Sequence, residues 1–85
     1  MVRKEVTVRT GAVLEAKSAA EFIQIASKYS SVIWLERGDK RANAKSLLGL
    51  LALGLSAGVE VRLITEGDDE DAAIAELGDY LALRI

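Results

Sequence analysis

The chain has 85 residues, of which 51% are hydrophobic, carries a formal net charge of −2, and contains neither cysteine nor histidine. This length and composition suffice for one small domain around a single core, so we expect residues 1–85 to form one domain. The missing residue types exclude disulfides, thiol nucleophiles and imidazole bases, and the slight negative charge disfavours a nucleic-acid partner.

The chain also lacks an apolar run long enough for a signal peptide or a membrane span. We therefore expect a soluble, cytoplasmic protein without a membrane partner. The reactive side chains that remain are carboxylates, hydroxyls and lysines, and this restricted set disfavours an enzyme. We expect no catalytic site, no cofactor and no metal site.

The first strand is expected over residues 2–9, where Val2, Val6 and Val8 share one parity and the other parity is polar. A helix should follow. Ser18 and Glu21 have the spacing of a capping box, in which both side chains bind free amides at a helix start, although the helix could begin one or two residues earlier. Its apolar stripe is Phe22, Ile23, Ala26 and Tyr29.

Residues 31–36 and 41–44 are expected to pair as two strands of a hairpin, with Gly38 in the turn between them. A short helix over residues 47–53 should then begin at Ser46, as its N-cap, and end at Gly54 in left-handed geometry.

The fourth strand is indicated by the alternating residues Val59, Val61 and Leu63. Residues 67–71 (GDDED), an acidic stretch, lead into a last helix, whose apolar residues recur at helical spacing: Ile74, Leu77 and Leu81. We interpret the acidic stretch as a solvated helix start that complements the helix dipole, rather than as a metal site.

The resulting order is β-α-β-β-α-β-α, an α+β protein. Strands with one polar face indicate an antiparallel sheet covered by helices on one side.

Two apolar features should remain at the surface. Because a short helix can bury only one stripe, we expect Leu50 and Leu53 to face the core and to leave Leu47, Leu48 and Leu51 exposed, either as a partner surface or as ordinary scattered surface leucines.

On the uncovered sheet face, Trp34 and Ile64 should pair across neighbouring strands. Self-association through that face is the alternative, and we prefer local pairing.

Three stretches together resemble HPr, the histidine-containing phosphocarrier of the bacterial sugar phosphotransferase system. Residues 44–49 (AKSLLG), with Gly54 and Gly58 beyond them, resemble the regulatory-serine helix of HPr from Gram-positive bacteria. Residues 18–22 and 66–70 resemble two further family stretches. The resemblance implies an open-faced β-sandwich whose four-stranded antiparallel sheet has the order 1-4-2-3, with three helices on one face.

The resemblance places Glu15 where the family has its phosphorylated histidine, with Lys17 and Ser18 in place of the motif's arginine and proline. Glu15 offers no nitrogen nucleophile, so a phosphohistidine relay is excluded. Three interpretations stay open for Glu15: an ordinary exposed residue near a helix start, a partial mimic of phosphohistidine, or, least favoured, an acyl phosphate. We prefer the first.

Ser46 has two compatible roles. It can cap the helix that follows it, and the resemblance implies that a kinase phosphorylates it.

We therefore expect a non-catalytic HPr-like regulator that docks on other proteins in carbon-catabolite control. The resemblance implies HPr kinase/phosphorylase and a LacI-type catabolite-control repressor as partners, and we expect a monomer or weak dimer. The alternative is a constitutive adaptor or allosteric subunit of a metabolic enzyme or transporter, independent of phosphorylation. The expected partner-binding residues are Glu15, Lys17, Ala20, Gln24, Ser27, Leu47, Leu48 and Leu51.

Overall fold

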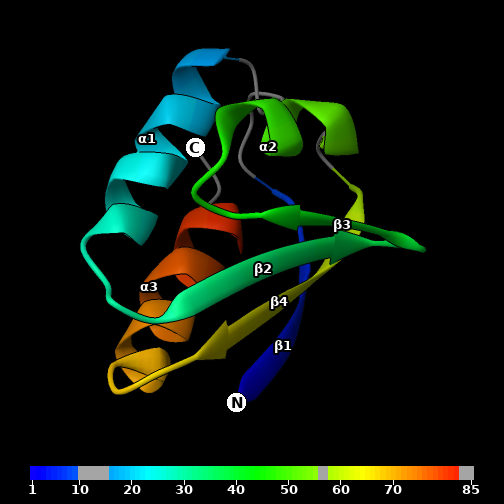
Figure 1. The fold of residues 1–85 in the computed structure, drawn as a ribbon. Helices are drawn as coiled ribbons and strands as arrows, with labels where there is room; N and C mark the ends of the chain where they lie inside the picture. The colour runs from blue at the N-terminus through cyan, green and yellow to red at the C-terminus, as the bar shows by residue number, and fades with distance from the viewer. Residues whose placement is uncertain (10–15, 56–57, 83–85) are drawn as a thin grey trace.

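The computed structural model describes residues 1–9, 16–55 and 58–82, with the side chains of residues 16 and 17 excepted. Strands and helices follow in the expected order, and their ends lie within a few residues of the expected bounds. They are β1 (Val2–Thr7), α1 (Ala16–Ser27), β2 (Val32–Arg37), β3 (Lys40–Asn43), α2 (Leu47–Leu53), β4 (Glu60–Glu66) and α3 (Glu70–Ala82) (Figure 1).

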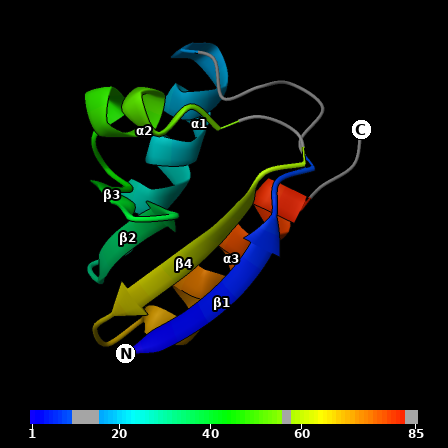
Figure 2. The ribbon, with the colours of Figure 1, turned by 90° about the vertical axis from the view of Figure 1, so that its right-hand side faces the viewer.

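The strands form one antiparallel sheet in the order β1-β4-β2-β3. All three helices lie on the same side of it: α3 packs on β1 and β4, whereas α2 packs on β3 and α1 packs on both other helices (Figures 1 and 2). This confirms the expected open-faced sandwich.

The core lies between the sheet and the helices and draws on every element. Alternate residues of the strands point into it because successive side chains of a strand point to opposite faces. Its largest fully buried apolar side chains are Val8, Phe22, Ile33, Leu35, Leu50, Leu55, Leu63, Leu77 and Leu81.

The hairpin between β2 and β3 is tighter than expected. Arg37 pairs directly with Lys40, so only Gly38 and Asp39 form the turn. Gly38 takes a φ of 60°, a conformation that a glycine adopts without the steric cost of a side chain.

The capping box expected at Ser18 is wrong, because α1 already begins at Ala16 and Ser18 lies inside the helix. Glu21 does not bind amides at the helix start. Its carboxylate instead accepts a hydrogen bond from the hydroxyl of Tyr80 on α3, at 3.1 Å. A contact with a distant helix has replaced the local cap.

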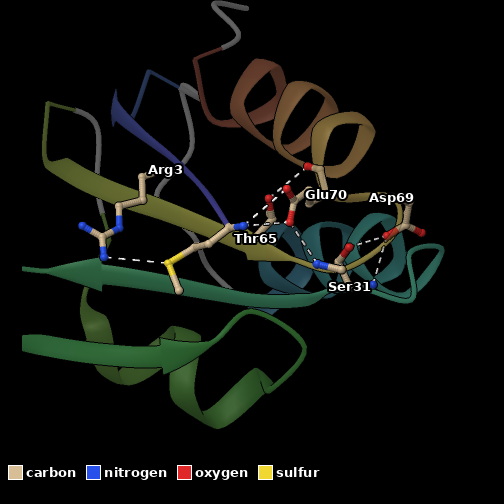
Figure 3. Close-up of polar contacts among 7 residues, drawn as sticks. Arg3, Ser31, Thr65, Asp69 and Glu70 are labelled. Atoms are coloured by element: carbon tan, nitrogen blue, oxygen red, sulfur yellow. Dashed lines mark hydrogen bonds and ion pairs between the residues drawn. The ribbon is translucent and has the colours of Figure 1, made fainter.

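The acidic stretch at the start of α3 is only partly the solvated helix start that we expected. Asp68 and Asp71 are exposed, but Asp69 accepts a hydrogen bond from the amide of Ser30. It also accepts hydrogen bonds from Ser31 (Figure 3). Glu70 accepts a bond from the Gly67 amide at 3.1 Å, and this bond lowers its pKa. Part of the stretch therefore joins α3 to the rest of the fold.

Among the helices of the described residues, none combines the length and the apolar character that crossing a membrane requires.

Candidate docking face

Helix α2 is closed at both ends by its own sequence. Ser46 has extended geometry (φ −112°, ψ 117°), and its Oγ accepts a hydrogen bond from the amide of Gly49 at 3.2 Å. At the other end Gly54 is left-handed (φ 67°, ψ 46°), and its amide donates to the carbonyl of Leu51. Both expected caps are confirmed.

The leucines of α2 divide as expected between core and surface. Leu50 and Leu53 are buried, whereas Leu47 and Leu51 are 40% and 39% exposed and Leu48 is 80% exposed. Three large apolar side chains are thus presented to solvent within five residues.

Gly49 lets α2 lie close to the sheet. A Cβ at this position would stand only 3.2 Å from the Cβ of Ala42 on β3 and 3.3 Å from the Oγ of Ser46. The missing side chain therefore allows the close approach of α2 to β3 and leaves room for the capping hydroxyl.

Helix α1 packs beside α2 (Figure 1). It exposes the residues that we expected at this surface. Ala20, Gln24 and Ser27 are exposed, at a spacing that keeps them on one helix face, while Phe22 and Ala26 are buried on the other. We call six exposed residues of the two helices the docking face: Ala20, Gln24, Ser27, Leu47, Leu48 and Leu51.

Two of the expected partner-binding residues are not placed beside this face. Glu15 lies outside the described residues. Lys17 falls in the first turn of α1, but its side chain is outside what the structure describes. The docking face therefore consists of six of the eight expected residues.

Two cations that the sequence did not single out hold α2 in place. The Lys45 ammonium donates to the carbonyls of Tyr29, at 2.8 Å, and Ser31, at 3.1 Å, just beyond α1. At the other end of α2, the Arg37 guanidinium donates to the carbonyls of Leu53 and Gly54 at 2.8 and 2.7 Å. No local pattern marks these residues, because their partners lie 14 to 17 positions away.

Helix α1 is held against α3 by two tyrosines. The hydroxyl of Tyr80 donates to the Glu21 carboxylate, and burial, followed by this bond, raises the pKa of Tyr80. The hydroxyl of Tyr29 donates to Glu76, which also forms an ion pair with Lys28 at 2.9 Å. These two contacts, that of the hydroxyl first, lower the pKa of Glu76. These contacts anchor the α1 side of the docking face to α3.

The docking face offers contact area, and the hydroxyl of Ser46 lies at its edge. Within the described ranges, no three metal-binding side chains gather. Half-buried Ser46 borders the exposed leucines, so a group added to its Oγ would alter the surface that a partner meets. This arrangement is suited to protein binding and to modification of Ser46.

Comparison with known proteins agrees with this geometry. Residues 2–82 match the family model described as the PTS HPr component phosphorylation site. The chain is 43% identical to the HPr-like protein Crh of Bacillus subtilis over 95% of both chains.

Two solved structures have the same fold. The crystal structure of HPr-C-His from Thermoanaerobacter tengcongensis superposes with a TM-score of 0.90 at 44% identity, covering 95% of this chain and 91% of the other. A crystal structure of Crh from Bacillus subtilis, a dimer with a swapping domain, gives a TM-score of 0.77 at 43% identity, covering 95% and 93%.

Proposed function

The chain belongs to the HPr family, and from this premise we propose that it is a non-catalytic regulatory paralogue that has lost the phosphohistidine relay. The observation that carries this proposal is the absence of histidine from all 85 residues. A relay through phosphohistidine needs an imidazole nitrogen that takes up the phosphoryl group and releases it again. Glu15, at the position that the resemblance assigns to that histidine, supplies none.

The regulator acts by binding other proteins through the docking face. Glu15 and Lys17 also take part in this binding. Exposed leucines support this role: Leu48 is the most exposed large apolar residue among those described, and Leu47 and Leu51 lie beside it on α2. Apolar side chains gathered in this way are typical of a partner surface. Likeness to Crh, whose structure is described as that of a catabolite-repression protein, supports a place in carbon-catabolite control.

Phosphorylation of Ser46 changes the affinity of the docking face. The Ser46 hydroxyl is half-buried at the start of α2, and a phosphoryl group there would add charge beside Leu47 without requiring the fold to change. The partners are HPr kinase/phosphorylase and a LacI-type repressor, and the protein acts in the cytoplasm with them. It would serve as a corepressor.

Incubation with HPr kinase and ATP tests the switch directly. We expect intact-mass spectrometry to find one added phosphoryl group and fragmentation to place it on Ser46, while Ser46→Ala stays unmodified. Enzyme I with phosphoenolpyruvate should leave the protein unlabelled. An unmodified Ser46 would remove the switch, and stoichiometric label from Enzyme I would overturn the loss of the relay.

One observation favours a second function, a constitutive adaptor. In the unmodified protein the Ser46 hydroxyl already caps α2, and the leucines are already exposed. Docking would then need no phosphate. Pull-downs with wild type, Ser46→Ala and Ser46→Asp separate the two functions, because the adaptor retains the same partners in all three and the switch does not.

A further inference from the structure

The side of the sheet away from the helices carries a row of alternating charge that crosses all four strands. The strand registers place Glu5 beside Arg62, Arg62 beside Glu36, and Glu36 beside Arg41. The signs along the row are therefore minus, plus, minus, plus. We call these four residues the charge row. In Figure 2, β1 and β4, which carry its first half, pass in front of α3.

A second row lies next to the charge row on the same side of the sheet. Its central pair is Ile64 on β4 and Trp34 on β2, direct neighbours in the register, as expected from the sequence. Ile64 is only 4% exposed, yet it lies outside the core cluster, because its own sheet neighbours cover it rather than a helix. We call Arg3, Ile64, Trp34 and Asn43 the apolar row, after its centre.

Local contacts satisfy the middle of the charge row better than its β1 end. Glu36 accepts from Arg41, at 2.8 Å, and from Arg62, at 3.0 Å, and these contacts, that of Arg41 first, lower its pKa. Glu5, however, stands 3.9 Å from Arg62 and is 80% exposed on its side chain. Glu5 is therefore available to a second cation.

The centre of the apolar row is also not fully covered. The Arg41 guanidinium lies over the Trp34 ring at 4.9 Å, but the ring remains half-buried and the next residue on this side of β2, Val32, is 50% exposed. An apolar strip thus runs beside the charges.

The charge row is self-complementary under a two-fold axis that lies over the uncovered face of the sheet, parallel to the strands and above the line between β4 and β2. This rotation lays β1 of one copy over β3 of the other, so that Glu5 meets Arg41 and Arg62 meets Glu36. In the apolar row the half-buried Trp34 of one copy lies opposite the position of Ile64 in the other. A two-fold interface buries the same surface on both subunits. Each charge of the row must therefore face an opposite charge when the row is laid over a copy of itself in reversed order. The rotation also keeps the strand directions aligned, as in packed sheets.

We propose that the uncovered sheet face is a docking surface for a second copy of this chain, formed by the charge row and the apolar row. The occupant is the same protein because the order of charges complements itself. This goes beyond the proposed function and leaves the docking face free, since α1 and α2 lie on the other side of the sheet. The dimer is weak, because exposed ion pairs contribute little.

A hollow of about 190 Å³ in the charge row fits the same arrangement. Three of its lining residues are glutamates, and the axis brings Arg41 of the second copy opposite one of them, Glu5. The hollow therefore offers an acidic site for the incoming guanidinium. It is lined by Glu5, Glu36, Gly38, Glu60, Val61 and Arg62.

The test combines sedimentation equilibrium with the fluorescence of Trp34, the only tryptophan of the chain. Over a concentration series into the millimolar range, we expect a monomer–dimer equilibrium, with a blue shift of the Trp34 emission at the same midpoint. Added salt should weaken both signals together. A chain that stays monomeric across the series overturns the proposal.

Charge reversal identifies the surface. Glu5→Lys turns two attractive contacts of the dimer into repulsive ones, so we expect association to weaken by about tenfold or more. Asp79→Lys is the matched control, because it makes the same change of charge on exposed α3, and it should not weaken the dimer. A melting curve for each variant checks that it is folded.

The double variant Glu5→Lys, Arg41→Glu separates the dimer from the monomer. Within one copy it places like charges side by side, because the introduced lysine lies near Arg62 and the introduced glutamate lies near Glu36. Across the axis, however, it restores opposite charges. Recovery of association therefore supports the two-fold contact and cannot come from better folding. Two outcomes overturn the proposal: a dimer whose affinity is unchanged by these substitutions, and a dimer that forms without a change in the emission of Trp34. Either result would mean that another contact holds the dimer, for example exchange of a segment.

Discussion

Asp69, the residue before α3, accepts hydrogen bonds from both the backbone amide and the hydroxyl of Ser31, the residue before β2 (Figure 3). The amide bond measures 3.0 Å, and the amide of Ser30 donates to the same carboxylate at 2.9 Å. Since Lys45 binds the carbonyl of Ser31, this one loop joins α3 to the segment that begins α2.

We expect the stabilisation from Asp69 to depend on pH. The Ser31 hydroxyl and then the Ser30 amide hold the pKa of Asp69 below its ordinary value. Its contribution is therefore complete above the ordinary aspartate pKa of about 4 and is lost as the pH falls through the lowered value. Asp69→Asn should unfold at lower urea concentration than wild type at pH 7, by a margin that shrinks in acid.

Urea titrations over a pH series measure this margin. Asp79→Asn, an exposed change on the same helix, is the control and should leave the midpoint nearly unchanged. A loss of stability in Asp69→Asn that is equal at every pH would show that the carboxylate charge plays no part.

Gly67→Ala should destabilise the protein strongly. A Cβ at Gly67 would lie 2.6 Å from the Oγ and 2.8 Å from the Cα of Ser31, and the φ of 151° adds strain. Gly38→Ala is the control, because a Cβ at Gly38 would meet no described atom within 4 Å beyond its chain neighbours. With a φ of 60°, it bears only the left-handed cost of about 1–2 kcal/mol. Thermal unfolding of the two variants should rank Gly67→Ala lower, and an equal loss would contradict the close contact.

Ser46→Ala should lower the free energy of unfolding by about 1 kcal/mol, because the amide of Gly49 loses its acceptor. Ser46→Asp should recover most of this loss, since a carboxylate also caps a helix. Chemical denaturation measures both variants. An unchanged stability of Ser46→Ala would contradict the cap. Binding measurements on either variant must be corrected for its change in stability.

Leucines on opposite sides of α2 should respond differently to truncation. Leu50→Ala empties a buried site and should cost about 2–5 kcal/mol of stability. Leu48→Ala removes a side chain that is 80% exposed and should change stability by less than about 0.5 kcal/mol. Binding assays on Leu48→Ala then report on docking alone. A large loss of stability in Leu48→Ala would argue that this leucine belongs to the core.

Features that depend on neighbours along the chain could be predicted from the sequence. Alternating residues marked the strands, and Ser46 and Gly54 marked the ends of α2, because caps act within one turn of a helix. Burial of Leu50 and exposure of Leu48 followed from helical spacing. The strand order came from the resemblance to HPr, and the structure confirmed it.

Only the tertiary structure decided which distant groups meet. Ser18 and Glu21 have the local spacing of a capping box, but α1 begins earlier, at Ala16. The carboxylate of Glu21 instead accepts a hydrogen bond from Tyr80 of α3. Asp69 stands 38 positions from Ser31, beyond the reach of any local rule, and the partners of Lys45 are backbone carbonyls that no side-chain pattern reveals. The order of charges across the sheet arises in the same way, since each strand supplies one residue of the charge row and only the register of the four strands aligns these residues.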